Sequence, residues 1–301
     1  MKHGLLLVDK EGGCTSHDVV QEVRRRIGQK KIGHCGTLDP DATGLLLLTL
    51  GRGTRLTRFL IRAPKVYEGD IRFGTATDTY DASGTVTEEA STVGLDTERV
   101  AEAMRTFEGD LHQNPPPYCA TKVGGVKFYE LARRGEAVPE KTKTVHVWSF
   151  QPTGGLEGND LAFRLACSSG TYARSLAHEL GRRLGTASHL ARLRRTQIGG
   201  FNVEQAVRAG EVGAAFDPDR ESTSFIPFDA IPLPFEEIRT DAQQERRITH
   251  GQTVLVRDAR IDEGDWVKVV NGRREFVAVG AVVESLGEDG VRVVQPKIVF
   301  K

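Results

Sequence analysis

Paired cysteines, long apolar runs and an excess charge of either sign are all missing from this chain of 301 residues. Its four cysteines form no C-x-x-C pair, which disfavours a zinc site and predicts free thiols in a reducing compartment. No run reaches the roughly 18 apolar residues that a membrane helix needs. Asp9 also cuts the first apolar run too short for a signal peptide. We therefore expect a cytoplasmic protein that makes no contact with a membrane.

The chain carries 41 Lys and Arg and 41 Asp and Glu, so net charge does not point to a nucleic-acid partner, but the cations are clustered along the sequence. Clustering can create a positive surface on a neutral protein, although any one cluster is more typical of a solvated helix face. The three basic clusters are Arg24, Arg25, Arg26, Lys30 and Lys31; Arg52, Arg55, Arg58, Arg62 and Lys65; and Arg174, Arg182, Arg183, Arg192, Arg194 and Arg195.

A glycine-rich stretch from residue 33 to residue 44 places a carboxylate and a histidine on a tight loop. It reads Gly-His-Cys-Gly-Thr-Leu-Asp-Pro-Asp-Ala-Thr-Gly. Pro40 fixes its own φ and favours an extended Asp39, and four leucines that follow at 45–48 predict a buried segment. The loop therefore presents Asp39 and His34 from an anchored position. An ordinary Asp-Pro turn is an equally good interpretation of this stretch alone.

The first half of the chain alternates predicted strands and helices. Residues 4–8 and 66–73 have the pattern of strands, and alternation places Tyr67 toward the core or a neighbouring cleft. A packed core tyrosine is the simpler interpretation of that position. Helices are expected from Thr15 or Ser16 to Gly28, from about residue 54, and over 96–107. The aspartates in the polar loop 77–84 are more typical of Asx turns than of a metal site.

The middle of the chain contains a second candidate group of polar residues. Residues 112–135 combine a proline run with tyrosines and cations, namely Tyr118, Lys122, Lys127, Tyr129 and Arg133, which suits RNA. Strands are predicted at 145–150 and 161–167, with a helix after Thr171 that has Tyr172 and Arg174 in its first turn. A cation there opposes the helix dipole, so we expect a carboxylate partner for Arg174.

The pattern changes after a polar linker over residues 216–226. Short strands are predicted at 254–256, 266–270, 276–283 and 291–294, separated by glycine-containing turns. About 70 residues are close to the minimum for a separate core, and this pattern is typical of a small barrel. We therefore predict two domains, residues 1–228 and 229–301.

Six segments in order along the chain resemble the motifs of TruB-type tRNA pseudouridine synthases. They are residues 33–44, Asp9-Lys10, Lys65-Val66-Tyr67, Pro116-Pro117-Tyr118-Cys119-Ala120, Gly170-Thr171-Tyr172-Ala173-Arg174 and Leu193-Arg194-Arg195-Thr196. The resemblance implies an α+β pseudouridine synthase fold, with a mixed, mostly antiparallel central sheet flanked by helices. It also implies a C-terminal PUA-like β-barrel that binds RNA. Two departures are Glu11-Gly12, where the family usually has proline after the lysine, and Cys35, where small hydroxyl residues are common.

The activity implied by the resemblance is isomerisation of uridine to pseudouridine at position 55 in the T-arm of tRNA. No group is oxidised in this reaction, and no cofactor or metal is expected. The implied partner is the T-arm stem-loop of tRNA, bound by a monomer. The basic clusters and the 112–135 segment would contact the phosphates of the RNA stem.

The resemblance also assigns roles to individual residues. Asp39 is the catalytic carboxylate and Arg174 is its cationic partner. Tyr67 stacks on the target uracil and assists removal of the C5 proton, with Lys10 supporting it. Tyr172 and Leu193 line the base pocket. His34 fills the place in the RNA stack that the extruded uridine leaves.

Two alternatives to this activity remain open from the sequence. An RNA-binding or RNA-folding protein with a silent pocket would keep the same basic clusters. A hydrolase would need Asp39 and Asp41 as a facing pair, which two residues separated by a proline do not favour.

Overall fold

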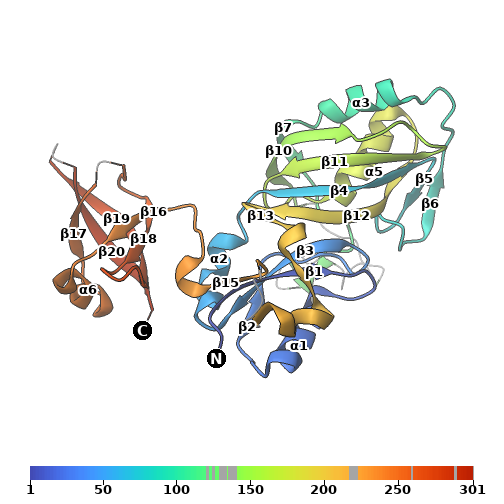
Figure 1. The fold of residues 1–301 in the computed structure, drawn as a ribbon. Helices are drawn as coiled ribbons and strands as arrows, with labels where there is room; N and C mark the ends of the chain where they lie inside the picture. The colour runs from blue at the N-terminus through green and yellow to red at the C-terminus, as the bar shows by residue number, and fades with distance from the viewer. Residues whose placement is uncertain are drawn as a thin grey trace.

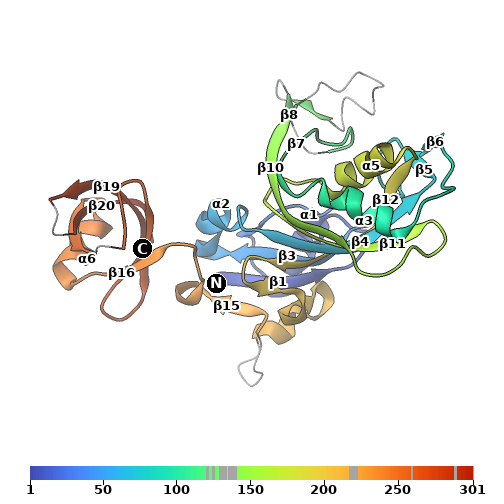
Figure 2. The ribbon, with the colours of Figure 1, turned by 90° about the horizontal axis from the view of Figure 1, so that it is seen from above.

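The computed structural model describes residues 1–119, 122–123, 126–128, 134, 141–216, 223–258, 260–287 and 290–300, without the side chains of 122–123, 126–127 and 214–215. A large body and a smaller one are joined by a single chain segment (Figures 1 and 2). Among the described residues, no helix is both long and apolar enough to cross a membrane.

The large body is built on an 11-stranded mixed sheet. Its main path runs β14-β1-β3-β12-β4-β11-β10-β7, while β2, β13 and β15 pair at its sides. Most pairings are antiparallel, but β3 and β12 meet in a short parallel contact at the middle of the sheet. The strands are β1 Gly4–Lys10, β2 Ile32–His34, β3 Thr43–Leu50, β4 Lys65–Phe73, β7 Gly109–Gln113, β10 Lys143–Pro152, β11 Asp160–Cys167, β12 Ser188–Ile198, β13 Phe201–Asn202, β14 Val207–Arg208 and β15 Phe225–Pro227.

Helix α1 (Ser16–Ile27) packs on the β1–β3 half of the sheet. Thr15 caps it in a reciprocal capping box with Asp18, and Gly28 ends it in the left-handed conformation, as the sequence predicts. Val19, Val20 and Val23 face leucines of β1 and β3 in one core cluster. The continuous apolar runs of β1 and β3 follow from burial of both faces of these strands.

The other half of the sheet is covered by α3 (Thr97–Arg105) and α5 (Ala173–Leu184), as Figure 1 shows. Leu176 and Leu180 of α5 and Met104 of α3 share a core with alternate residues of β4, β10 and β11. Two short hairpins project from this body: β5 (Thr75–Thr77) with β6 (Val86–Glu89), and β8 (Lys122–Val123) with β9 (Val126–Lys127). Along the chain, a 3-10 turn at Gly51–Leu56 and the one-turn α2 (Thr57–Leu60) connect β3 to β4. They lie on the side of the large body that faces the smaller one (Figures 1 and 2).

The smaller body is a five-stranded sheet of order β16-β18-β19-β20-β17. Its elements are β16 Glu236–Arg239, α6 Ala242–Thr249, β17 Val254–Arg257, β18 Trp266–Val270, β19 Phe276–Leu286 and β20 Val291–Val299. The sheet curls around its own apolar cluster. Phe228, Phe276 and Phe300 pack against one another at the junction with the large body.

The predicted polar linker is wrong in its last residues. Phe225–Pro227 form β15, which pairs with β1 in the large sheet. The sequence prediction also omits β16 and α6. The strand β16 is four residues long and mostly polar, whereas α6 begins at a capping box from Asp241 to Gln244 that the prediction missed. With only four residues, β16 is too short to show the alternation that identifies a longer strand.

Candidate functional site

The loop that carries Asp39 connects β2 to β3, and hydrogen bonds from Lys10 hold it in place. The Lys10 ammonium group donates to the carbonyl oxygens of Glu11, Pro40 and Ala42, at 3.0, 2.7 and 2.7 Å. Lys10 is fully buried, and this burial lowers its pKa below the ordinary value. Three carbonyl partners use all three donor hydrogens, so Lys10 fixes the shape of the aspartate loop.

This placement corrects the expectation that Lys10 supports Tyr67. The strand β1 ends under the loop, so the lysine reaches loop carbonyls instead of the phenol. The residue beside Tyr67 is Arg195, its partner in the β12–β4 pairing, and the charge of Arg195 opposes the rise that burial causes in the pKa of Tyr67. Nothing in the sequence indicates this position, because Arg195 is there one more cation of a basic cluster.

Arg195 joins the aspartate loop to the start of β3 from a position that is only 1% exposed. Its Nε donates to the carbonyl of Leu45 at 2.8 Å, and its Nη2 donates to the carbonyl of Gly36 at 3.1 Å. Gly44 makes this approach possible: its φ is +100°, and a Cβ there would lie 2.3 Å from the Arg195 carbonyl oxygen. Only glycine allows β3 and β12 to meet at this point.

Arg174 lies at the start of α5 and holds Asp39 side-on. Its Nε is 3.0 Å from Oδ2 of Asp39, and its Nη2 is 3.2 Å from Oδ1. Nη1 lies 3.3 Å from Oδ2 of Asp81 and donates to the Thr79 carbonyl at 3.0 Å, while Nη2 also donates to the Tyr118 carbonyl at 3.0 Å. The predicted carboxylate partner is therefore present, and a second carboxylate accompanies it. These contacts offset the unfavourable position of Arg174 in the helix dipole.

Asp81 is the member of this group that the sequence did not reveal. It does form the expected Asx turn, since its Oδ1 accepts from the Ser83 amide at 3.0 Å. Its Oδ2, however, faces Arg174. The sequence pattern shows only the local bond, because the partner is on a helix far along the chain.

Burial raises the pKa of Asp39 above its ordinary value, and Asp81 adds to the rise, whereas the Arg174 guanidinium opposes it. The Asp39 side chain keeps 44% of its exposure, and that of Arg174 keeps 5%. The cation is thus fixed by the protein, while the carboxylate is open to a bound molecule.

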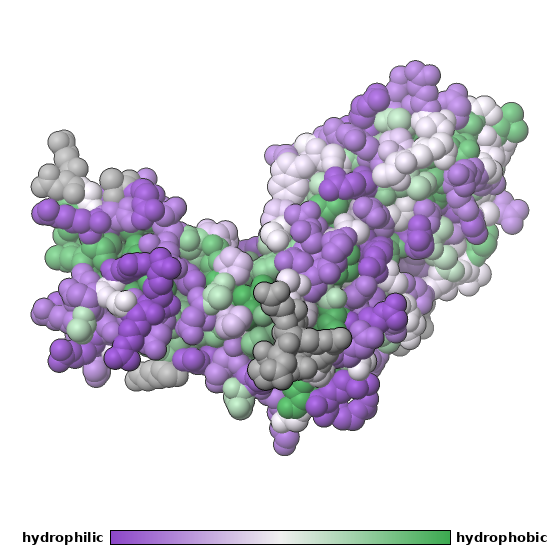
Figure 3. Space-filling view, viewed as in Figure 1, coloured by the Kyte–Doolittle hydropathy of each residue, from purple (hydrophilic) through white to green (hydrophobic). Residues whose placement is uncertain are grey.

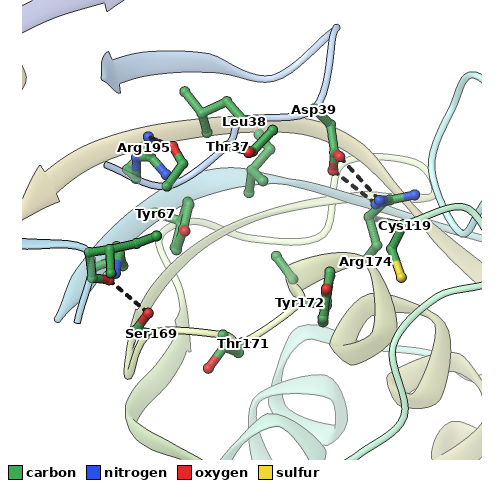
Figure 4. Close-up of a pocket in the computed structure, with 16 residues that line it drawn as sticks. Thr37, Leu38, Asp39, Tyr67, Cys119, Ser169, Thr171, Tyr172, Arg174 and Arg195 are labelled. Carbon is green, nitrogen blue, oxygen red and sulfur yellow. Dashed lines mark hydrogen bonds and ion pairs between the residues drawn. The ribbon is translucent and has the colours of Figure 1, made fainter. Parts of the chain in front are cut away.

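A cavity of about 300 Å³ opens between Asp39 and β4. Figure 4 shows Asp39 and Arg174 at one end, Ser169 at the other, and Tyr67, Tyr172 and Thr171 between them. The cavity is lined by Gly36, Thr37, Leu38, Asp39, Ile61, Lys65, Tyr67, Cys119, Ser169, Gly170, Thr171, Tyr172, Ala173, Arg174, Leu193 and Arg195. Its aromatic and apolar walls, with polar groups at both ends, suit a flat heterocycle. Burial raises the pKa of Tyr67, so its phenol is neutral in ordinary solution.

The amino-acid sequence of the chain matches one protein family over most of its length. The profile described as TruB family pseudouridylate synthase (N terminal domain) matches residues 24–173. The profile described as tRNA pseudouridylate synthase B C-terminal domain matches residues 174–238. The tRNA pseudouridine synthase B of Solibacter usitatus is 40% identical over 281 residues, which cover 93% of this chain and 96% of the relative. The chain belongs to the TruB family of pseudouridylate synthases.

Other relatives agree with this assignment. The tRNA pseudouridine synthase B of Thermobifida fusca is 42% identical over 262 residues, covering 84% of this chain and 87% of the relative. A chain in the structure of an H/ACA RNP bound to a substrate RNA containing 2′-deoxyuridine has a TM-score of 0.74 and 25% identity. The match covers 99% of this chain and 85% of the chain in that structure. The protein is therefore an isomerase with the pseudouridine synthase fold, as the resemblance implied.

The remaining residues that the sequence singled out fall at different places around the cavity of this TruB-family protein. Leu193 lines it from β12, and Tyr172 lies immediately before α5 as its N-terminal cap, one residue earlier than expected. His34 is half-buried on β2 and does not line the cavity. Burial lowers the pKa of His34, so the ring is neutral near pH 7. Its Nδ1 has no partner among the described residues.

Gln113 is a further residue that the sequence did not identify. Its side chain accepts from the Tyr172 amide at 2.8 Å and donates to the Tyr172 carbonyl at 3.0 Å. Tyr172 makes no side-chain capping bond to α5, and the Gln113 side chain from β7 instead binds both backbone groups of this N-cap residue. This bond sets the position of α5, and hence of Arg174, relative to the sheet.

The basic clusters are only partly available to bind phosphates. Arg192 and Arg194 pair with Asp70 and Asp9, at 2.6 and 2.8 Å, and Arg174 and Arg195 are buried. The third cluster is thus mostly structural. Tyr129, Arg133 and the side chains of Lys122 and Lys127 lie outside the described residues. No group of three or more potential ligand side chains that could hold a metal ion is found in the described parts of the chain.

Proposed function

We propose that this protein isomerises uridine to pseudouridine at position 55 in the T-arm of tRNA, with Asp39 as the catalytic carboxylate. The observation that carries the proposal is the side-on ion pair of Asp39 with Arg174 at the end of a cavity walled by Tyr67. The tRNA pseudouridine synthase B relatives, which match most of the chain, support the choice of substrate.

The reaction explains why a single open carboxylate is needed. The N1–C1′ bond of uridine breaks, the uracil turns within the site, and a C5–C1′ bond forms. C5 loses a proton while N1 gains one, so the product has the same composition as the substrate. A carboxylate at C1′ can form a covalent bond to the sugar or assist departure of the base toward a glycal. Either route requires ionised Asp39, which Arg174 favours.

A uridine stacked in an RNA loop must leave its stack to reach this cavity. Extrusion costs a few kcal/mol, and stacking on an aromatic side chain returns about 1–3 kcal/mol. We assign this stacking to Tyr67, with Tyr172 and Leu193 forming the other walls. His34 lies outside the cavity, where it can occupy the place left in the RNA stack. Lys10 acts on the aspartate loop and has no contact role with the base in this proposal.

Replacing Tyr67 by phenylalanine separates stacking from chemistry. Tyr67→Phe keeps the ring, so RNA affinity should stay within about twofold of the unaltered protein. It removes the hydroxyl that we expect to assist loss of the C5 proton, so single-turnover tritium release from C5-labelled uridine should slow. Unchanged release rates would remove any part for the hydroxyl in proton transfer.

We further propose that residues 229–301 act as an RNA-binding module attached to a catalytic domain of residues 1–228. Removing them should weaken binding of whole tRNA more than binding of a minimal T-arm stem-loop. A filter-binding comparison of both RNAs checks this. A thermal melt must accompany it, because truncation exposes Phe228, which packs on Phe276 and Phe300. Equal losses on both RNAs by a folded truncated protein would contradict a remote contact.

The direct test of the proposed function is to map pseudouridine in an unmodified tRNA transcript after incubation with the purified protein. We expect pseudouridine at position 55. An RNA that binds without gaining pseudouridine or releasing tritium would leave an RNA-binding protein with a silent pocket.

A further inference from the structure

A second cavity lies where α2 meets the smaller body. It has a volume of about 210 Å³ and is lined by Arg58, Phe59, Arg62, Pro234, Phe235 and Trp266. The Phe59 ring is 5.0 Å from that of Phe235 and 5.1 Å from that of Trp266, both edge-on. Ligand pockets for drug-sized molecules usually exceed about 300 Å³, so this volume suits one ring system. Figure 3 shows a hollow in the surface between the two bodies.

The charge at this cavity is positive. The guanidinium carbon of Arg58 lies 4.6 Å from the Phe59 centroid and 5.2 Å from the Trp266 centroid. A guanidinium that stacks on a ring keeps its in-plane donors available for a phosphate. Both Arg58 and Arg62 are exposed, and no carboxylate of the described residues pairs with either. This distinguishes them from Arg192 and Arg194, which are paired with aspartates.

Neighbouring residues of one chain segment line both cavities. Ile61 lines the cavity that contains Asp39, whereas Arg58 and Arg62 line the second one. One helical turn rises about 5.4 Å, so the two sites are close. The Ile61 carbonyl accepts from Ser169 Oγ at 2.8 Å, which ties this turn to the end of the first cavity opposite Asp39 (Figure 4). An RNA strand that leaves the first cavity past Ser169 would therefore meet Arg58 and Arg62.

We propose that the second cavity binds one unpaired nucleotide of the same RNA whose uridine is bound at Asp39. Its base stacks on Trp266 or Phe235, and Arg58 and Arg62 contact the phosphates on either side. Aromatic rings flanked by arginines are the combination that binds single-stranded nucleic acid without reading its sequence. The inference rests on the proposed function, because it takes the RNA substrate as given.

Fluorescence tests the stacking, because the chain has only two tryptophans. Trp148→Phe removes the exposed one on β10 and leaves Trp266 as the only emitter. Titration with an unmodified tRNA transcript should quench Trp266 with the same midpoint as filter binding. Trp266→Phe, which keeps Trp148, is the matched control for absorption by the RNA and should show no such midpoint. Unchanged Trp266 emission at saturating tRNA would overturn the proposal.

Salt dependence tests the arginines. The Arg58→Gln, Arg62→Gln double variant should bind tRNA about 10-fold more weakly, and its slope of log affinity against log salt should be shallower by about 1–2. Arg105→Gln, an exposed arginine on the distant α3 (Figure 1), should change neither. A double variant with an unaltered salt slope would contradict the proposal.

Tritium release by the unaltered protein separates this inference from the proposed function. Release without quenching of Trp266 would mean that the second site is wrong while the catalytic assignment stands. Quenching without release would count against the catalytic assignment and keep the second site.

Discussion

Asp39→Asn should abolish pseudouridine formation while leaving RNA affinity within a few-fold of the unaltered protein. The amide has nearly the shape of the carboxylate and can still meet Arg174, but it can neither attack C1′ nor stabilise positive charge that develops there. Loss of a central nucleophile costs roughly four orders of magnitude or more. Single-turnover tritium release and filter binding on one protein preparation measure both quantities.

Asp41→Asn is the matched control for this prediction. Asp41 is on the same loop and is exposed. It does not line the cavity that contains Tyr67, although it borders the adjoining cavity of about 360 Å³ on the Asp81 side of Asp39. Its replacement should therefore be mild. An Asp41→Asn protein as inactive as Asp39→Asn would support a pair of carboxylates and contradict the single-carboxylate mechanism. The structure disfavours that pair, since the carboxylate that shares Arg174 with Asp39 is Asp81.

Arg174→Gln should shift the acid limb of the pH–rate profile upward and strongly reduce activity at neutral pH. The Arg174 guanidinium lowers the pKa of Asp39, against burial that raises it. Removing an adjacent cation raises a carboxylate pKa by roughly 1–3 units. The active, ionised form is lost as the pH falls through this pKa, so the loss begins at a higher pH in the variant. Part of the activity should return at alkaline pH.

Asp81→Asn should shift the acid limb of the pH–rate profile toward lower pH, since Asp81 raises the pKa of Asp39. Arg72→Gln is the control, because it removes an exposed ion pair with Asp160 that lies outside the cavity lining. It should leave the profile unchanged. Shifts of the same sign in the Arg174 and Asp81 variants would indicate that both act through the fold. Thermal melts of each variant check the same point.

Local signals account for the parts of the fold that the sequence predicted. The helix α1 has a capping box at Thr15 and a glycine at its end, both of which depend on neighbouring residues. The strands β3 and β4 show their burial directly, as an apolar run and as an alternation. The position of Arg174 against its helix dipole also pointed to a carboxylate partner, which the structure places at Asp39.

Contacts between distant segments account for what the sequence did not reveal. Asp81 pairs with Arg174, Gln113 binds the amide of Tyr172, and Arg195 is the strand partner of Tyr67. Each of these side chains has an ordinary local explanation, as a turn residue, a strand residue or a surface cation. The expectation that Lys10 supports Tyr67 also lacked this information. Only the fold shows that β1 ends next to the aspartate loop, where Lys10 binds the carbonyls of Pro40 and Ala42.

The central claim is that a uridine leaves its RNA stack and enters the cavity beside Asp39. The most direct test is a crystal structure of the Asp39→Asn protein with an unmodified T-arm stem-loop. We expect the target uracil against Tyr67, with its C1′ facing residue 39 and the Arg174 guanidinium behind it. A target base still stacked within the RNA loop, with the protein bound and the cavity empty, would contradict the account.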